Sequence, residues 1–309
     1  MFKGCCTALI TPFTKDNKVN FKEFERIIEE QIAGGIDALL FLGTTGESPT
    51  LTEKEKLDIV KFAVKKVNKR VPVLVGAGSN CTAKAVENSI IYEALGVDGL
   101  LIVSPYYNKA TQEGLYLHYK EIAESVDIPI IIYNVPSRTG VNVNAETVIK
   151  LSKIKNIKGL KQASPDFEEL QKIVAGTDKD FFVYSGEDGL TYPMLCCGAK
   201  GVISVVSNLF PNYMSRLCES FFEGKREESF SLQQQINPLI KSLFNEVNPI
   251  PVKYAMNKLG YEAGVPRLPL TEMKNKQIVD ENLERNFDKK WKIFDFVWLF
   301  YQKFCIIKV

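Results

Sequence analysis

Short apolar runs alternate with amphipathic segments along most of the chain, from residue 4 to about residue 225. Residues 21–33 illustrate the amphipathic type, because Phe24, Ile27 and Ile28 recur at the spacing of one helical face. The stretch Thr52-Glu53-Lys54-Glu55 has the spacing of a capping box and predicts that another helix begins there. The apolar runs predict eight strands, at residues 4–10, 36–42, 71–75, 99–103, 128–133, 157–161, 181–184 and 201–204.

An internal repetition indicates how these strands are joined. Residues 35–42 (GIDALLFL) recur as residues 96–103 (GVDGLLIV), and residues 198–205 form a weaker copy. The first two copies lie 61 positions apart, which fits two strand–helix units of about 30 residues each. Eight such units within about 225 residues favour a closed α/β fold, the parallel (β/α)₈ TIM barrel, over an open sheet. The first strand is not followed by Gly-x-Gly-x-x-Gly, which argues against a dinucleotide-binding sheet.

Beyond residue 224 the pattern becomes purely helical. We therefore divide the chain into a barrel domain at residues 1–224, a C-terminal helical region at 225–290 and an atypical apolar tail at 291–309. Helices are predicted at residues 226–244, 251–259 and 271–287. The tail is interrupted by Asp295 and Lys303 and is too short and too charged to span a membrane. It could be a helix docked on the body or on a partner, a segment foreign to the domain, or a membrane-surface segment.

The charge and the cysteine content of the chain exclude several classes of function. The chain has 39 basic and 37 acidic residues, a net charge of +2 and no basic run interleaved with aromatic residues, so no nucleic-acid partner is expected. The amino terminus enters a strand pattern without a long apolar stretch, which argues against a signal peptide. The seven cysteines are odd in number and form no Cys-x-x-Cys, which favours reduced thiols. We expect a cytoplasmic protein that binds neither nucleic acid nor membrane.

Candidate chemistry gathers at the carboxyl ends of the predicted strands, where barrel enzymes of this kind carry their reactive groups. Lys161 ends the sixth strand after the apolar Leu160. If Lys161 points inward, desolvation favours its neutral amine, which is the nucleophilic form. A surface lysine at a strand end is the alternative interpretation. Thr44 and Thr45 lie between two glycines after the second strand, in a turn suited to a small carboxylate.

Two tyrosines and an arginine complete this set. Tyr107 follows the fourth strand, Tyr133 ends the fifth, and Arg138 lies in the turn after it. With Lys161 they suit imine formation between an amine and a 2-oxo acid, because tyrosines beside an ammonium can transfer protons. Taken singly, the threonines are also explained by a tight turn and the tyrosines by packing at the barrel rim.

Other kinds of site are disfavoured by the inventory of side chains. His118 is the only histidine, so a histidine-based metal site or a Ser-His-Asp triad is not expected, and we predict no metal. His118 lies within a predicted helix and is interpreted as a structural residue. The sequence contains no phosphate-binding P-loop.

Three motifs carry a resemblance to a known family: residues 43–51 (GTTGESPTL), 133–140 (YNVPSRTG) and 159–164 (GLKQAS). Through them the chain resembles the dihydrodipicolinate synthase / N-acetylneuraminate lyase family of Schiff-base (β/α)₈ enzymes, over about residues 1–290. The resemblance implies a lyase that condenses pyruvate with aspartate 4-semialdehyde to 4-hydroxy-tetrahydrodipicolinate. This reaction commits carbon to the biosynthesis of diaminopimelate and lysine.

At the matching positions, the resemblance implies that Lys161 forms a covalent imine with pyruvate and that no separate cofactor is needed. Thr44 and Thr45 would hold the pyruvate carboxylate, helped by the backbone around Gly186 and Ile203. These roles come from the resemblance and not from the spacing of the residues.

The resemblance also assigns the proton transfers and the second substrate. Tyr133 would donate and accept protons, and Thr44 would link it by hydrogen bonds to Tyr107, which enters the neighbouring subunit's site. Arg138 would bind the carboxylate of aspartate semialdehyde. Members of the family are commonly tetramers built from two tight dimers, so a homotetramer with Tyr106 and Tyr107 at the tight interface is expected.

Alternatives to this activity remain within and outside the family. A guanidinium at Arg138 matches a small carboxylate acceptor better than the long polyol of a sugar acid. A pyruvate-dependent aldolase acting on another aldehyde is the second enzyme hypothesis. A barrel that has lost activity and serves as a binding or structural protein is the third, although the intact Lys161, Tyr133 and Thr44 argue against it.

A last expectation concerns regulation by lysine. Inhibited members of the family bind lysine at their dimer interface, and the corresponding residues here are Ser48, Pro49, Glu53, Lys56, Asn80, Lys84 and Tyr106. Lys56 stands where such members often carry histidine, and Lys84 stands where they carry a glutamate that receives the amine of the inhibitor. A cation at position 84 repels the ammonium of lysine. We therefore expect a vestigial site and an enzyme that lysine inhibits weakly or not at all.

Overall fold

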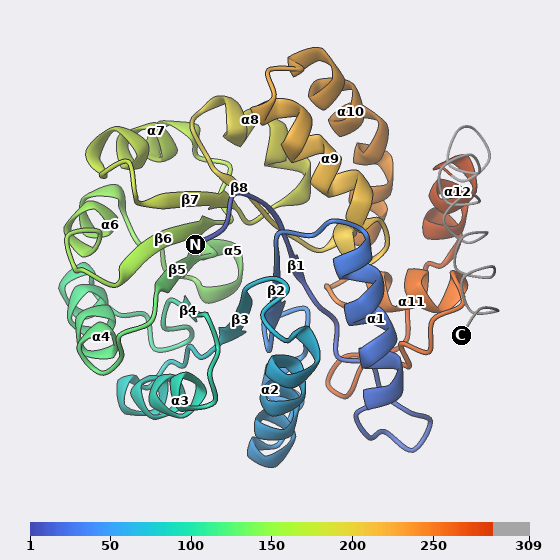
Figure 1. Cartoon of the computed structure of the whole chain (residues 1–309), viewed down its shortest axis with the longest axis horizontal. Helices are drawn as coiled ribbons and strands as arrows, with labels where there is room; N and C mark the ends of the chain where they lie inside the picture. The colour runs from blue at the N-terminus through green and yellow to red at the C-terminus, as the bar shows by residue number, and fades with distance from the viewer. Residues whose placement is uncertain (287–309) are drawn as a thin grey trace.

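The computed structural model of the chain describes residues 1–286 and contains a closed barrel of eight parallel strands in the order β1 to β8 (Figure 1). Pairing of β1 with β8, with Cys6 opposite Ile203, closes the barrel. This confirms the fold predicted from the alternating pattern. The strands are β1 Gly4–Ala8, β2 Ala38–Phe41, β3 Val73–Gly76, β4 Gly99–Val103, β5 Ile130–Asn134, β6 Ile157–Gln162, β7 Phe182–Ser185 and β8 Gly201–Ser204.

Helices cover the outside of the barrel, and most begin at a side chain that caps the first turn. The capping box predicted at Thr52 is present, because its hydroxyl accepts a hydrogen bond from Glu55 N and the Glu55 carboxylate accepts one from Thr52 N. The helices are α1 Phe21–Ala33, α2 Glu53–Val67, α3 Thr82–Ala94, α4 Gln112–Glu124, α5 Pro136–Thr139, α6 Ala145–Leu151, α7 Phe167–Gly176, α8 Thr191–Cys196 and α9 Pro211–Phe222. Short 3₁₀ segments lie at η1 Ser48–Thr50, η2 Asp188–Leu190 and η3 Val206–Asn208.

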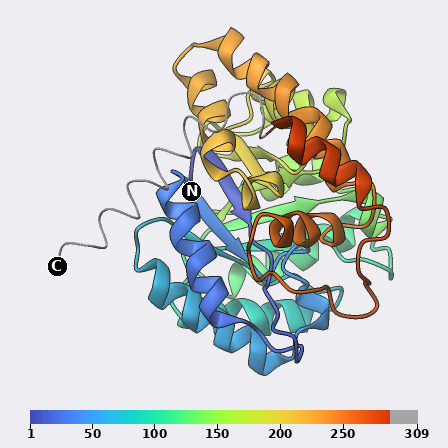
Figure 2. The same ribbon diagram turned by 90° about the vertical axis from the view of Figure 1, so that its right-hand side faces the viewer.

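Three further helices, α10 Arg226–Leu243, α11 Ile250–Lys258 and α12 Gln277–Asn286, contact one another on one side of the barrel (Figures 1 and 2). The helix expected at residues 271–287 is wrong in its first part, because α12 begins only at Gln277. The N–H groups of Lys274 and Asn275 donate to the Glu246 carboxylate instead of entering a helix. The domain boundary at residue 224 stays a prediction, and the tail at 291–309 lies outside the described residues.

Two layers of apolar side chains form the core. One layer lies between the strands and the outer helices, and the other fills the inside of the barrel. At the amino-terminal end of the strands, Phe2 stacks on Tyr184 with 4.3 Å between ring centroids, and the Tyr184 hydroxyl donates to Phe2 O. A filled interior leaves the carboxyl ends of the strands as the place for a binding site.

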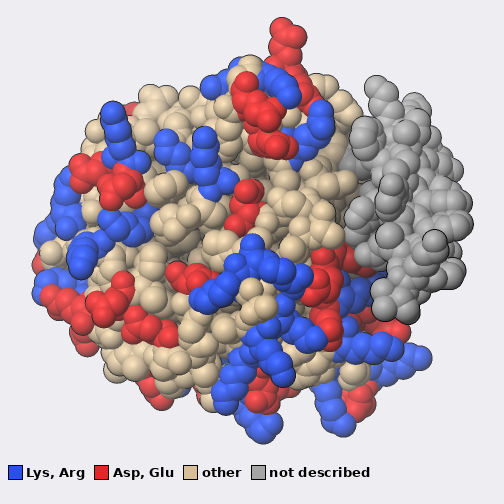
Figure 3. Space-filling model, in the orientation of Figure 1, with Lys and Arg blue, Asp and Glu red and all other residues tan. Residues whose placement is uncertain are grey.

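The distribution of charge on the surface and the character of the helices agree with the nearly neutral composition of the chain. Acidic and basic side chains are interspersed over the face seen in Figure 3. Among the helices of the described residues, none combines the length and the apolar character that a membrane span requires.

His118 makes folding stability depend on pH in a predictable direction. It is buried on α4 with Nδ1 3.0 Å from Thr82 Oγ1, and burial lowers its pKa to about 4. In the unfolded chain the histidine has a pKa of about 6.5. Between pH 4 and pH 6.5, therefore, the unfolded chain binds a proton at His118 that the folded chain does not bind. We expect the unfolding free energy to fall by about 3 kcal/mol as the pH drops through this interval.

The measurement is urea unfolding on both sides of this interval for the wild type and for His118→Asn, which lacks the titrating group. Because the chain has a single histidine, its imidazole proton resonance reports the pKa directly. An equal pH dependence in the two proteins, or a titration near the ordinary histidine pKa, would contradict the prediction.

Candidate active site

A cavity of about 840 Å³ opens at the carboxyl ends of the strands. Its wall contains side chains from the ends of several strands, from the loops that follow them and from the carboxyl end of α10. Six of the eight predicted catalytic and substrate-binding residues line it: Thr44, Thr45, Tyr133, Arg138, Lys161 and Gly186. The structure thus brings together the lysine, one tyrosine, the threonines and the arginine that sequence reasoning placed at separate strand ends.

Lys161 and Tyr133 form the floor of this cavity. They are directly opposite each other in the pairing of β5 with β6, and Lys161 Nζ lies 4.3 Å from the centroid of the Tyr133 ring. Lys161 is 5% exposed and Tyr133 7% exposed, so the inward orientation of the lysine holds and the surface alternative is wrong. A partly desolvated amine beside a phenol is suited to form an imine and to exchange protons during its formation.

The next residue on each of the two strands takes part in hydrogen bonds on the side of the sheet away from the cavity. Asn134 Nδ2 donates to Gln162 Oε1 at 3.0 Å, and Gln162 Nε2 donates to Glu169 at the start of α7. Asn134 Oδ1 in turn accepts from Val143 N. Because successive side chains of a strand point to opposite faces, this buried polar network holds β5 and β6 together without entering the cavity.

The loop after β2 carries the two threonines in a strained backbone. Leu42 and Glu47 have positive φ angles of 54° and 55°, a conformation that residues other than glycine rarely adopt. The N–H groups of Gly46 and Glu47 donate to Gly43 O and Thr44 O within the turn. The N–H groups of Thr44 and Thr45 do not take part in these hydrogen bonds of the turn. They are therefore the donors of the predicted carboxylate-binding turn that remain for a ligand.

A buried ion pair holds this loop in place. Lys253 Nζ of α11 lies 2.7 Å from Glu47 Oε1, and the two side chains are 0% and 1% exposed. Lys253 Nζ also lies 4.0 Å from the centroid of the Phe13 ring, and Glu47 Oε2 accepts from Arg267 N. Burial lowers the pKa of Lys253 to about 8, which keeps the ammonium protonated at neutral pH.

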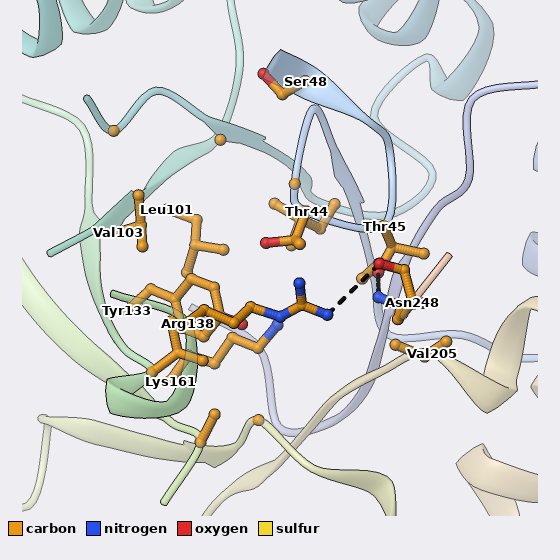
Figure 4. A pocket seen from close by; sticks show the side chains of 18 of the residues that line it. Thr44, Thr45, Ser48, Leu101, Val103, Tyr133, Arg138, Lys161, Val205 and Asn248 are labelled. Carbon is orange, nitrogen blue, oxygen red and sulfur yellow. Dashed lines mark hydrogen bonds between the residues drawn. The ribbon is translucent and has the colours of Figure 1, made fainter. Parts of the chain in front are cut away.

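Asn248 connects the threonine loop with the arginine (Figure 4). Its Nδ2 donates to Thr45 Oγ1 at 3.0 Å, and its backbone carbonyl accepts from Arg138 Nη2 at 3.5 Å. Since Thr45 Oγ1 accepts this hydrogen bond, its own O–H stays available to donate to a ligand. Arg138 lies on the short helix α5 with an exposed side chain that crosses the cavity toward Asn248 (Figure 4).

The wall after β7 consists of Gly186, Glu187 and Asp188. A Cβ at position 186 would lie 2.7 Å from Ala163 Cβ, so only glycine allows this close approach of the backbone to β6. Asp188 is 2% exposed, and its Oδ2 accepts from Val205 N and Val206 N. Burial raises the pKa of Asp188, while Glu187 is half-buried and burial raises its pKa as well.

Three predicted residues do not line the cavity within the described part of the chain. Ile203 is 1% exposed and packs inside the barrel, while Val205, two residues further along the chain, lines the cavity. Tyr107 is 89% exposed, with a positive φ of 72°. Asn80 lies beside the cavity, where its Nδ2 donates to Tyr106 O.

The remaining residues of the expected lysine site line the same cavity. They are Ser48, Pro49, Glu53, Lys56, Lys84 and Tyr106. Glu53 lies between two cations, with Lys56 Nζ at 3.0 Å and Lys84 Nζ at 3.5 Å. The hydrogen bond from Lys56 is the main cause that lowers the pKa of Glu53.

Comparison with known proteins decides the family. The model of the dihydrodipicolinate synthetase family matches residues 1–285. The chain belongs to this family. It is 48% identical over 286 residues to the 4-hydroxy-tetrahydrodipicolinate synthase of Acetivibrio thermocellus, covering 92% of this chain and 97% of the relative.

Solved structures agree with this assignment to the dihydrodipicolinate synthetase family. The dihydrodipicolinate synthase of Thermotoga maritima superimposes with a TM-score of 0.90 at 44% identity, covering 92% of this chain and 98% of the other. A structure described as the first monomeric dihydrodipicolinate synthase variant matches with the same TM-score and identity, covering 92% and 96%.

The sequence did not reveal the residues that lie far along the chain from the three motifs and hold them in place in the structure. Asn248 lines the cavity and Lys253 pairs with Glu47 of the loop after β2, yet neither stood out in a sequence pattern. The only available signal was for Asn248, because Asn-Pro-Ile-Pro at 248–251 marks a turn in an otherwise helical region. Glu187 and Asp188 follow Gly186 at the end of the seventh predicted strand, so their place at a strand end was predictable, but no role was predicted for them.

Proposed function

We propose that this protein condenses pyruvate with aspartate 4-semialdehyde to give 4-hydroxy-tetrahydrodipicolinate, the committing step of diaminopimelate and lysine biosynthesis. One observation carries the chemistry: a buried lysine amine, Lys161 Nζ, lies 4.3 Å from the Tyr133 ring centroid at the floor of a cavity. Membership in the dihydrodipicolinate synthetase family, and the name that a 48% identical relative carries, support the choice of substrates.

Each cavity residue has a role in this proposal. The neutral amine of Lys161 attacks C2 of pyruvate, and loss of water gives an imine that activates C3 as a nucleophile. Thr44 and Thr45 hold the pyruvate carboxylate, with the backbone at Gly186 and near Ile203 closing the site. Tyr133 moves the protons that these steps release and consume.

The second substrate binds on the side of Arg138. The exposed guanidinium is free to form a bidentate pair with the carboxylate of aspartate semialdehyde, and its contact with Asn248 O fixes its direction. The enamine carbon then adds to the aldehyde, and the substrate's own amine attacks the imine carbon, which closes the ring and releases the Lys161 amine. Because the imine supplies the electron sink, the reaction that we propose requires no separate cofactor or metal.

The proposal extends to assembly and location. We propose a homotetramer of two tight dimers, in which Tyr107 enters the neighbouring subunit's site and relays protons to Thr44 and Tyr133. An aromatic side chain that is 89% exposed on a backbone with positive φ supports a role outside its own subunit. The substrates are small water-soluble metabolites, in agreement with a cytoplasmic enzyme.

The experiment that tests this function is a product assay with pyruvate and three aldehydes: aspartate semialdehyde, N-acetylmannosamine and glyceraldehyde. We expect turnover with aspartate semialdehyde and a pyruvate adduct that borohydride traps on the protein. Preference for a sugar aldehyde would instead identify an aldolase of different specificity, and the absence of both turnover and adduct would leave a non-catalytic barrel.

We further propose that lysine is a poor inhibitor, because Lys84 and Lys56 already occupy both sides of Glu53. Millimolar lysine should leave the rate nearly unchanged in the wild type. Lys84→Glu, which provides a carboxylate for the inhibitor's ammonium, should create measurable inhibition. Initial rates against lysine concentration are the measurement, with Lys120→Glu on the exposed face of α4 as the control for charge. Strong inhibition of the wild type by sub-millimolar lysine would contradict this proposal.

A further inference from the structure

The cavity contains a carboxylate that the proposed chemistry leaves unused. Glu187 lines the cavity directly after Gly186, on the wall that follows β7. Among the described residues, none donates a hydrogen bond to its side-chain oxygens and none forms an ion pair with it. A half-buried carboxylate without a cation is costly, which is why burial raises its pKa.

The backbone of Glu187 is nevertheless held firmly. The buried Ser185 hydroxyl donates to Glu187 O at 2.7 Å and accepts from Glu187 N at 3.2 Å. Leu190 N also donates to Glu187 O at the start of η2. The carboxylate is therefore presented to the cavity from a fixed point, as a binding group requires, and not from a mobile loop.

Its neighbour Asp188 serves a different purpose. Asp188 is 2% exposed and uses Oδ2 to bind the N–H groups of Val205 and Val206, which fixes the turn after β8. Asp188 thus has donors to its carboxylate, whereas the Glu187 carboxylate has none among the described residues. Of the two adjacent acids, Glu187 is the one available to a ligand.

The charges of the cavity match one of the two proposed substrates. Pyruvate carries only a carboxylate, but aspartate semialdehyde carries a carboxylate and an ammonium at neutral pH. Arg138 supplies a cation without an ion-pair partner among the described residues, and Glu187 supplies an anion in the same cavity. We infer that Glu187 binds the ammonium of aspartate semialdehyde and so determines that the acceptor is an amino aldehyde. This inference rests on the proposed function and names the second determinant of its specificity.

The test compares two aldehydes that differ only in the amino group. The enzyme is assayed with aspartate semialdehyde at saturating pyruvate, and succinic semialdehyde, which lacks the amine, is measured as a competing ligand. Glu187→Gln keeps the size of the side chain and removes its charge. We expect kcat/KM for aspartate semialdehyde to fall about 10- to 100-fold, the range for a lost charge-assisted hydrogen bond. The inhibition constant of succinic semialdehyde should stay within about twofold, because that ligand has no ammonium to lose.

Two further variants separate the explanations. Glu187→Asp retains the charge and should recover most of the loss, while Glu121→Gln on the exposed face of α4 should change nothing. Borohydride trapping of pyruvate should be equal in all variants, because the imine forms without the second substrate. An unchanged kcat/KM in Glu187→Gln, or equal losses for both aldehydes, would overturn the inference. Failure of the proposed function is distinguishable, since the wild type itself would then not turn over aspartate semialdehyde.

Discussion

Lys161→Ala is expected to lower kcat by more than about 10⁴-fold with aspartate semialdehyde and pyruvate, because removal of a covalent nucleophile leaves no alternative path. Lys161 is the lysine that the barrel buries at the cavity floor, 4.3 Å from the Tyr133 ring centroid. Its replacement removes the amine but leaves Thr44, Thr45 and Arg138 in place. The variant should therefore still bind pyruvate while losing the adduct that borohydride traps, as read by the mass of the intact protein.

Lys158→Ala is a matched control for this prediction. Lys158 lies on the same strand, three residues earlier, where its Nζ pairs with Asp180 at 2.8 Å on the surface. Its loss should leave both turnover and trapping near the wild-type level, because the pair is partly exposed and outside the cavity. If Lys161→Ala kept more than about a hundredth of the activity, or still formed the adduct, another amine would have to carry the imine.

Breaking the Lys253–Glu47 pair is expected to cost about 3–5 kcal/mol of folding stability, because either single replacement leaves an uncompensated buried charge. In Lys253→Met the Glu47 carboxylate keeps only Arg267 N as a described donor, and in Glu47→Gln the ammonium loses its counterion. The double replacement removes both charges and should be less destabilised than the sum of the single variants. Denaturant unfolding of the three variants measures this difference.

The same pair also sets the shape of the site. Glu47 has a positive φ and ends the loop that holds Thr44 and Thr45, so the single variants should raise the KM for pyruvate as well. Lys54→Met is the matched control, because Lys54 pairs with Asp58 on the exposed face of α2 and its loss should change neither property. Additive losses in the double variant would show that the two buried charges do not act as a pair.

The barrel was predictable because its signal is local and repeated. Each strand is buried on both faces, so a run such as 99–103 is apolar throughout, and the helices between the strands carry capping residues such as Thr52. The position of Lys161 and Tyr133 at the same end of neighbouring strands followed from the parallel connections alone. Strand ends shifted by one or two residues, because hydrogen bonding and not apolar character decides where pairing stops.

The features that the sequence did not predict depend on contacts between distant parts of the chain. Asn248 reaches Thr45 across 203 positions and Lys253 reaches Glu47 across 206, and no periodic pattern encodes such pairs. The same reason explains the helix wrongly predicted at 271–276, where Glu246 from another segment captures two N–H groups. The side chain of Ile203 packs inside the barrel and does not line the cavity, so the role of its backbone near the substrate stays a prediction.

The links between the helical region and the loop after β2 have a consequence during protein synthesis. All eight strands have been translated once Ser204 is added, but Asn248, Lys253 and Arg267 follow later. Arg267 donates hydrogen bonds from Nη1 and Nη2 to the two carboxylate oxygens of Glu55, at the start of α2. A chain still on the ribosome therefore contains all eight strands before it contains the residues that anchor the loop after β2. Pyruvate binding is therefore expected only once these last residues have emerged, so that an incomplete product of translation should be inactive.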